Sequence, residues 1–280
     1  MTGADARPSR EGRVARAWVA GHFGELLQGR LGPEGPVALV TLPCPALGVL
    51  ATRVPGGFGL RRSGARVIGR EGSRRFLASL GLPARGVFGL RLGMPPGGGA
   101  GASTAARVAL ARVAACGEIA PDRLARACVA SEGASDPLMM TAPERLLWAS
   151  REGRSLGAMP GLPAMEILGG FLGPGQRTAA DDRHFPEIAD LVEDWRAAAG
   201  DLPRLAALAS TSAERCLALR GPAADPTAAL AARLGALGWG IAHTGSARAL
   251  IFAPGEVPGT GAAALRAAGF RGVIRFGVGG

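Results

Sequence analysis

Hydrophobic positions in the first half of the chain follow two periods, one typical of strands and one typical of helices. Alternating or continuous apolar runs predict strands at 14–20, 36–54 and 86–93. Apolar residues at helical spacing predict helices at 70–82, 103–116, 121–132 and 139–150. Pro143 interrupts the last of these, because proline lacks the N–H that a helix interior requires. This half is therefore predicted to combine a sheet with helices.

The second half has a different order of elements. Strands are predicted at 164–171, 240–243, 249–252 and 272–276. Helices are predicted at 185–199, 202–219, 226–237 and 260–268. Several helices followed by a mixed tail indicate a second α+β lobe. A Gly/Pro-rich stretch at 152–165 separates the halves, so the predicted lobes are 14–160 and 161–280.

Length and composition fit a folded protein with a sizeable core. The 280 residues are 48% hydrophobic, and none of the apolar stretches approaches the roughly 20 residues of a membrane span. Residues 1–13 lack the apolar centre of a signal peptide and are predicted to be a disordered leader. Reduced packing residues are expected at Cys44, Cys116, Cys128 and Cys216. The chain is therefore predicted to be soluble and cytoplasmic.

The net charge of +10 first suggests a nucleic-acid partner. However, the 32 basic residues are all arginine, they are spread along the whole length, and tyrosine is absent. No dense basic block with interleaved aromatic residues is present, so neither a nucleic acid nor a membrane is expected as partner. A basic surface also suits an anionic nucleotide, which it would attract over a distance.

The most informative local pattern is the glycine-rich run Met94–Ala106, which follows a predicted strand and opens a predicted helix. Small residues from Gly97 to Ala102 permit positive φ and close approach to a ligand. The N–H groups of such a loop and of a helix N-terminus bind anions. Ser103 and Thr104 add hydroxyls that can cap the helix or bind Mg²⁺. The run therefore predicts a phosphate site, with a flexible turn and helix cap as the alternative.

The absence of lysine narrows the kind of phosphate site. A P-loop needs its Gly-Lys-Ser/Thr sequence and a protein kinase needs its strand lysine, so both classes are excluded. A dinucleotide fingerprint remains as an alternative, because Gly97, Gly99 and Ala102 have its spacing and Glu118 follows about 20 residues later. Glu118, however, lies in what looks like a helix end and not a second strand.

Three motifs in chain order resemble those of the GHMP kinase superfamily (galacto-, homoserine, mevalonate and phosphomevalonate kinases). The segment Pro95–Ala105 has the Pro-x-x-x-Gly-x-Gly-x-Ser form of its phosphate loop. The segment Ala20–Gly29 resembles the first motif, and its Gly-Glu-Leu-Leu-Gln-Gly run is closer to the L-threonine kinases of cobalamin synthesis than to the mevalonate branch. The segment Gly240–Ala247 resembles the third motif of those threonine kinases. The resemblance spans residues 17 to 252.

This resemblance implies a two-lobed α+β GHMP kinase fold, with a ribosomal S5 domain 2-like N-terminal lobe and a ferredoxin-like C-terminal lobe. ATP and substrate would lie in the cleft between the lobes. Two departures matter: Ala102 replaces the usual first serine of the loop, and the lysine that many members carry in the first motif is absent. His22 or an arginine is then expected near the phosphates.

The resemblance also assigns the cofactors. The ATP-binding residues are predicted to be Pro95, Pro96, Gly97, Gly98, Gly99, Ala100, Gly101, Ala102, Ser103 and Thr104. Ser103 and Glu132 match the hydroxyl and carboxylate that hold Mg²⁺ in the family. Glu132 ends a predicted helix, where a carboxylate opposes the local dipole. That unfavourable place favours a functional role over an ordinary surface glutamate.

Asp136 is the candidate to accept or orient the proton of the substrate hydroxyl, and it is predicted to be catalytic together with Ser103. The alternative for Asp136 is an Asp-Pro turn. Contacts to the substrate are predicted for residues of the first and third motifs and for one acidic residue after the strand at 164–171. These are His22, Glu25, Gln28, Asp182, His243, Thr244 and Gly245. Packing, capping or strand-end hydrogen bonding is the alternative role for them.

Together these features predict an ATP- and Mg²⁺-dependent kinase that phosphorylates the side-chain hydroxyl of L-threonine. The product would be O-phospho-L-threonine, which feeds cobalamin synthesis. Another acceptor, homoserine or an isoprenoid acid, is the nearest alternative. A nicotinamide-dinucleotide-binding protein that uses the same glycine loop is an alternative of a different class. The sequence leaves the oligomeric state open.

Overall fold

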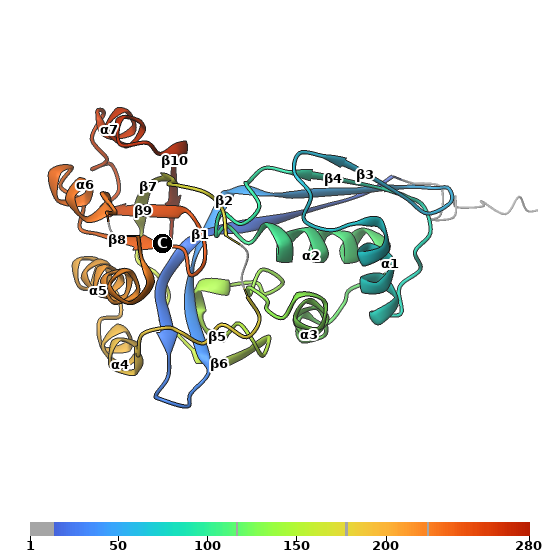
Figure 1. Cartoon of the computed structure of the whole chain (residues 1–280), viewed down its shortest axis with the longest axis horizontal. Coiled ribbons are helices and arrows are strands. Elements are labelled where there is room, and N and C mark those ends of the chain that lie inside the picture. Colours follow the sequence, from blue (N-terminus) through green and yellow to red (C-terminus); the bar gives the residue numbers. More distant parts are fainter. Residues whose placement is uncertain (1–13, 116, 177–178, 223) are drawn as a thin grey trace, which may run out of the picture.

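One sheet runs through both halves of the chain in this computed structural model (Figure 1). The structure describes residues 14–115, 117–176, 179–222 and 224–280, so the predicted leader at 1–13 and Cys116 lie outside the described residues. Within these ranges the sheet has ten strands, with the order β10-β7-β9-β8-β1-β2-β4-β3; β5 is attached to β2, and β6 to β5. The strands are β1 (Ala15–Arg30), β2 (Val37–Val54), β3 (Gly59–Ser63), β4 (Val87–Leu92), β5 (Leu146–Ala149), β6 (Arg154–Ala158), β7 (Met165–Phe171), β8 (Gly238–Ile241), β9 (Ala247–Phe252) and β10 (Arg271–Val278).

The helices form two groups, one for each part of the sheet (Figure 1). The first group is α1 (Arg70–Ser79), α2 (Ala102–Ala114) and α3 (Pro121–Glu132). The second group is α4 (Ala189–Ala197), α5 (Leu202–Arg220), α6 (Thr227–Arg233) and α7 (Gly261–Ala267). In the first group α2 packs against β1, β2 and β4, and in the second group α5 packs against β1 and β8, α6 against β8 and β9, and α7 against β7 and β10. No helix in the described ranges has the length and apolar character that crossing a membrane requires.

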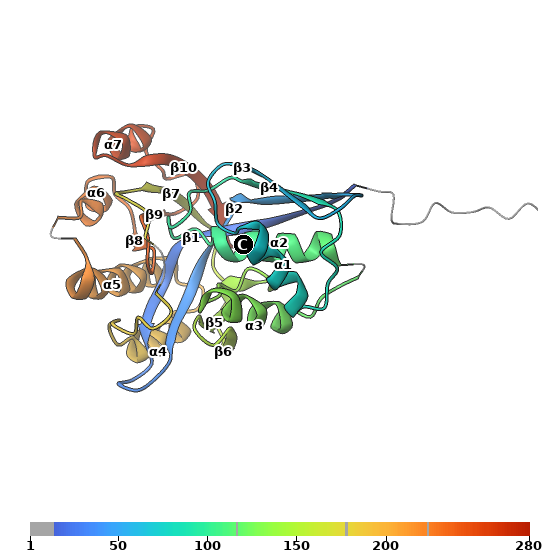
Figure 2. The same ribbon diagram turned by 45° about the vertical axis from the view of Figure 1, so that its right-hand side comes forward.

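Strands β1 and β2 form the long antiparallel hairpin at the centre of the fold, and its turn projects away from the rest (Figure 2). β1 pairs with β2 along nearly its whole length, but it pairs with β8 only through Glu25 and Ile241. The pairing of β1 with β2 shifts register at three places between Ala20 and Leu27. Such bulges bend a strand and redirect its side chains. The bend brings the first motif against the third motif on β8.

Helix α2 is buried almost all around, which explains its composition. It lies against β1, β2 and β4, with α1 and α3 beside it. Nearly every residue from Ala102 to Ala114 is buried, including Arg107. A helix enclosed on all sides is apolar on all faces, and small alanine side chains let the strands approach closely. The start of α2 is therefore held firmly in the middle of the molecule.

The mixed α+β fold that the sequence predicts is confirmed, with corrections to individual elements. The predicted helix at 139–150 is wrong: a 3₁₀ turn at Pro143–Arg145 leads into β5, which pairs with the edge of β2. Pro143 removes a helical N–H and keeps Ala142 out of the helical region, with φ −131° and ψ 76°. The sequence analysis also missed β3 and β6, and it ended β1 ten residues early. The predicted lobe boundary at residue 160 falls between β6 and β7 and stays a prediction.

Candidate active site

The glycine loop joins β4 to α2 and has a backbone that only glycine adopts readily. Gly97, Gly99 and Gly101 have φ angles of 71°, 74° and 72°, and Gly101 is the residue that precedes the first turn of α2. A Cβ atom on Gly99 would lie 2.1 Å from Cβ of Ala242. Both the positive φ and the lack of space require glycine here.

The loop is held from both sides through its carbonyl groups. On one side, the N–H groups of His22 and Gly24 in β1 donate to the carbonyls of Ala100 and Gly99, at 3.2 and 3.1 Å. On the other side, the N–H groups of residues 246 and 247 donate to the carbonyl of Gly98, at 3.1 and 2.8 Å. No described residue accepts a hydrogen bond from the N–H groups of residues 99 to 104. These donors are the ones that an anion would need.

A cavity of about 390 Å³ opens next to these N–H groups. All three predicted motifs contribute to its wall, as do α3 and the segments that follow α3 and β5. Of the predicted ATP-binding residues, all but Pro95 and Gly98 line it. The other lining residues include His22, Glu25, Arg66, Val67, Arg107, Glu132, Asp136, Ser150, Arg151, His243 and Thr244.

Ser103 and Glu132 lie together on the wall of this cavity. The hydroxyl of Ser103, in the first turn of α2, donates to Oε2 of Glu132, the last residue of α3. Arg107 lies one turn after Ser103, so its guanidinium reaches both groups: Nη1 is 2.8 Å from Oγ of Ser103 and 3.1 Å from Oε2 of Glu132. The pair therefore offers hard oxygen ligands for Mg²⁺, with a buried cation beside them.

Asp136 faces the same cavity and is positioned by its neighbours. Its N–H donates to Oγ1 of Thr104 at 3.3 Å, which joins the segment after α3 to the start of α2. The preceding Ser135 is held at its carbonyl by the indole N–H of Trp148 at 2.6 Å, and its N–H donates to the carbonyl of Ser150 at 2.8 Å. The Asp-Pro turn predicted as an alternative and a functional carboxylate are compatible in this geometry.

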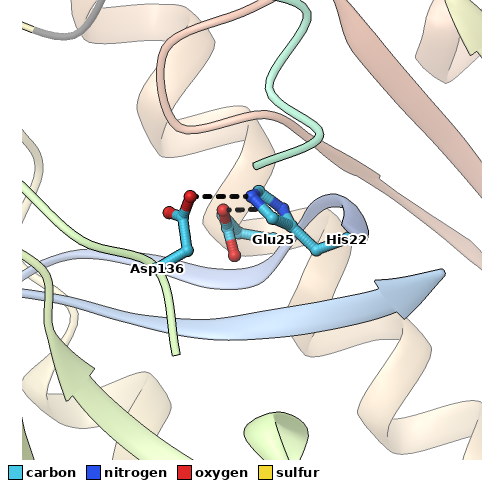
Figure 3. A group of neighbouring side chains, drawn as sticks. All are labelled: His22, Glu25 and Asp136. Carbon is cyan, nitrogen blue, oxygen red and sulfur yellow. Dashed lines mark ion pairs between the residues drawn. The ribbon is translucent and has the colours of Figure 1, made fainter. Parts of the chain in front are cut away.

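His22, Glu25 and Asp136 form a buried cluster of charged groups (Figure 3). Nδ1 of His22 lies 3.4 Å from Oε1 of Glu25, and Nε2 lies 3.5 Å from Oδ2 of Asp136. The register shifts of β1 turn both His22 and Glu25 toward the cavity, where Asp136 meets them from the segment after α3 (Figure 3). One ligand atom from each side chain lies within 4.8 Å of the other two, so the cluster could also hold a cation.

Burial and mutual attraction set the charges of this cluster. Burial opposes a charged ring at His22, but the carboxylates of Glu25 and Asp136 outweigh it and raise the pKa of His22 to about 9. Burial raises the pKa of Glu25 to about 8. Burial would also raise the pKa of Asp136, but the charge and hydrogen bond of His22 hold it below its usual value. His22 and Asp136 therefore favour each other's charged form, so that a cation faces an anion in this cluster.

His243 and Thr244 of the third motif also reach the cavity. The ring of His243 stacks on Phe185, with centroids 3.9 Å apart and an interplanar angle of 9°. Burial and the charges of Arg151 and Arg220 lower the pKa of His243 to about 3, so this ring is neutral. The structure thus brings together one charged and one neutral histidine at a single cavity.

Three of the residues predicted to contact substrate lie away from the lining of this cavity. Gln28 is buried and donates through its amide to the carbonyl of Ile241, which ties β1 to β8. The carboxylate of Asp182 pairs with Arg220 at 2.6 Å. Gly245 packs on the glycine loop, where a Cβ atom would lie 2.5 Å from N of Gly99. The roles predicted for these residues stay predictions.

The sequence analysis missed the arginines and the serine of the cavity wall. Arg66, Arg107, Ser150 and Arg151 all line the cavity. With 32 arginines spread along the chain, no spacing rule separates these from surface residues. Arg107 alone had a usable signal, because it is a single charged residue within the otherwise small and apolar first turns of α2.

Comparison with known proteins finds no match to a protein-family model and no match among curated protein sequences. Solved structures, however, match along nearly the whole chain. A mevalonate kinase of L. major in complex with R-mevalonate has 15% identity and a TM-score of 0.67, over 97% of this chain and 98% of that one. A mevalonate kinase of Methanococcus jannaschii has 12% identity and a TM-score of 0.63, over 96% and 98%.

A third similar structure is described as a putative homoserine kinase of Listeria monocytogenes. It has 15% identity and a TM-score of 0.59, over 96% of this chain and 97% of that one. At such identities the likeness concerns the fold alone. The chain has the mixed α+β fold of the GHMP kinases.

Proposed function

We propose that this protein is an ATP- and Mg²⁺-dependent kinase of the GHMP superfamily that phosphorylates the hydroxyl of a small molecule. The observation that carries the proposal is the row of unpaired N–H groups at residues 99 to 104, next to a cavity that also contains Asp136 and the Ser103–Glu132 pair. Phosphoryl transfer depends mainly on positioning and on neutralising phosphate charge. This wall has groups for both tasks.

The glycine loop and α2 fit the phosphates of ATP. The loop N–H groups are free, and the helix N-terminus adds about half a positive charge. His22 lies beside the loop, since a Cβ atom on Gly101 would be 2.7 Å from its Cδ2 atom. Many GHMP kinases carry a lysine in the first motif. We assign to the charged His22 the electrostatic role of that lysine, which is to attract the phosphates.

Ser103 and Glu132 fit Mg²⁺, which prefers a few oxygen ligands and keeps several waters. The bound ion would neutralise negative charge on the transferred phosphate. Arg107 already donates to both groups, so it holds Ser103 and Glu132 in place and supplies part of the positive charge at this wall.

Asp136 is assigned to the acceptor hydroxyl. His22 keeps the carboxylate of Asp136 ionised. Such a carboxylate is better suited to orient the hydroxyl and accept its proton late in the transfer than to remove that proton at the start. We propose L-threonine as the acceptor and O-phospho-L-threonine, a precursor in cobalamin synthesis, as the product, on the motif resemblance. Homoserine or an isoprenoid acid remains the alternative acceptor, since homoserine and mevalonate kinases have this fold.

A nicotinamide-binding function is less consistent with the topology. Dinucleotide-binding folds have a mostly parallel sheet with the glycine loop inside a βαβ unit. Here the central strand pairs are antiparallel, and β3 with β4 is the parallel pair of strands in the described sheet. The kinase proposal is therefore the one that the topology supports.

Replacing Gly99 with Val should weaken ATP binding at least about ten-fold, or about 1.4 kcal/mol. The valine Cβ would collide with Ala242, and β-branched residues avoid positive φ. Calorimetry with a non-hydrolysable ATP analogue measures the affinity, and circular dichroism checks folding. Gly57→Val is the matched control, because its Cβ would meet no atom within 4 Å. Unchanged affinity in a folded Gly99→Val protein would contradict the phosphate assignment.

Ser103→Ala and Glu132→Gln should each raise the Mg²⁺ concentration required for half-maximal rate and lower kcat. Each change removes an oxygen ligand or its charge. The rate of ADP release at fixed ATP, measured over a Mg²⁺ titration, reports both effects. Glu152→Gln is the control, because that carboxylate is exposed and pairs with Arg154. If both variants keep the wild-type Mg²⁺ curve, the metal assignment is wrong.

With L-threonine, L-homoserine and R-mevalonate compared in an ADP-release assay, we expect the highest kcat/KM for threonine. The reacting atoms must lie about 3–3.5 Å apart and be aligned. Homoserine places its hydroxyl one carbon further from the ammonium, so a site built for threonine would hold that hydroxyl out of position. An equal or reversed preference would move the assignment to the homoserine branch.

Asp136→Asn should lower kcat by about 10²–10⁴ with ATP affinity unchanged. An effect confined to KM would mean that Asp136 only positions the acceptor.

The affinity for ATP should fall as the pH rises through about 9. The raised pKa means that His22 keeps its positive charge up to that pH and loses it above, so the attraction to phosphate weakens by about ten-fold. His22→Gln should bind ATP more weakly at neutral pH and lack the fall in affinity that the wild type shows near pH 9. His184→Gln is the control, since that ring is exposed. The same pH profile in wild type and His22→Gln would exclude His22 from the phosphate site.

A further inference from the structure

Several residues of the cavity wall have buried polar atoms without a partner. Oγ of Ser150, Nε and Nη2 of Arg151, and both ring nitrogens of His243 have no hydrogen-bond partner among the described residues. Native proteins pair the great majority of such buried groups, and leaving one unpaired costs about 1–3 kcal/mol. All three residues line the cavity. Their grouping indicates a place made for a polar part of a ligand.

Arg151 differs from the neighbouring arginines because it makes no direct ion pair, although the charges of Asp182 and Asp136 act on it. Arg107 pairs with Glu132, and Arg220 pairs with Asp182. No hydrogen bond or ion pair joins Arg151 to any other described residue. Its Nε and Nη2 atoms are shielded and have no hydrogen-bond partner, and the residue lines the cavity. A half-buried guanidinium is favourable only with an anion beside it.

His243 and Ser150 add neutral hydrogen-bonding groups to this charge. The stack on Phe185 fixes the orientation of the His243 ring, and the guanidinium of Arg220 lies 4.1 Å from the centroid of the same phenyl ring. Arg220, held by its pairing with Asp182, thus supports the ring on which His243 rests. Arg151, Ser150 and His243 therefore combine one positive charge without an ion pair, a hydroxyl and a neutral imidazole on the cavity wall.

We propose that Arg151, with Ser150 and His243 beside it, binds a carboxylate of the acceptor, so that this enzyme selects hydroxy acids over alcohols or sugars. One guanidinium balances one carboxylate charge, and its planar fork matches a carboxylate. Asp136 is close enough for its charge to act on both Arg151 and His243, so the hydroxyl and the carboxylate can belong to one small molecule. This inference rests on the proposed kinase function.

The test compares L-threonine with L-threonine amide, which has a neutral group in place of the carboxylate. In the wild type we expect kcat/KM to be about 100-fold higher for threonine, within the range for a buried charge pair that loses one partner. Arg151→Met should lower kcat/KM for threonine by a similar factor, mainly through KM, and leave the amide almost unchanged. Arg151→Lys should restore part of the preference. If Arg151 were purely structural, Arg151→Met would lower kcat/KM equally for threonine and for its amide.

Calorimetry without turnover gives a second readout. L-threonine, L-homoserine and R-mevalonate are titrated into wild type, Arg151→Met and Arg154→Met with a non-hydrolysable ATP analogue bound. Arg154 is the matched control, because it is exposed on the same hairpin and pairs with Glu152. We expect the acid that binds wild type to bind Arg154→Met equally and Arg151→Met about 100-fold more weakly, with the affinity for the ATP analogue unchanged in all three.

The outcomes separate the two proposals. If an acid is phosphorylated but Arg151→Met binds it as well as wild type does, the carboxylate assignment is wrong and the kinase function stands. Equal kcat/KM for threonine and its amide in the wild type would lead to the same conclusion. If none of the three acids binds or is phosphorylated, both the carboxylate assignment and the proposed acceptors are wrong. If an acid binds through Arg151 without phosphoryl transfer, only the kinase function fails.

Discussion

The arrangement of this molecule depends on how the backbone of the glycine loop is held. The carbonyls of residues 98 to 100 accept hydrogen bonds from β1 on one side and from the start of β9 on the other, so two distant segments fix one loop. These hydrogen bonds hold the loop in place, and the N–H groups of residues 99 to 104, at the end of the loop and the start of α2, have no backbone acceptor in the described chain. Gly99 and Gly245 are needed for the close contact that this requires.

Charges around the cavity are balanced in pairs, and the imbalance that remains is informative. His22 with Asp136 and Arg107 with Glu132 each combine a cation with an anion at short distance. Burial makes an unpaired charge costly, so these pairs hold each other in position. Among the described residues, neither Arg151 nor the exposed Arg66 on the same wall forms such a pair. The wall therefore has both free N–H groups and cations without an ion pair, which suits anionic ligands.

Local patterns predicted some parts of the structure well and failed at others for identifiable reasons. The glycine loop and α2 followed from neighbouring residues, since positive φ and helix initiation are local properties. The stretch at 139–150 failed because its apolar residues fit a helix, whereas Pro143 and the free edge of β2 favoured a turn and a strand. Arg107 and Arg151 could not be selected in advance, because their roles depend on the buried carboxylates and cavity around them.

The sequence by itself determined the mixed α+β class, the glycine loop before a helix and the three motifs in chain order, because each depends on residues close together in the chain. Only the tertiary structure decided which motif residues meet. It places His22, Glu25 and Asp136 in one cluster. Gln28, which belongs to the same motif as His22 and Glu25, ties β1 to β8 instead. The bulges of β1 and the packing of β8 set these directions. A shift of one residue in strand register turns a side chain to the other face, and the register depends on contacts between distant segments.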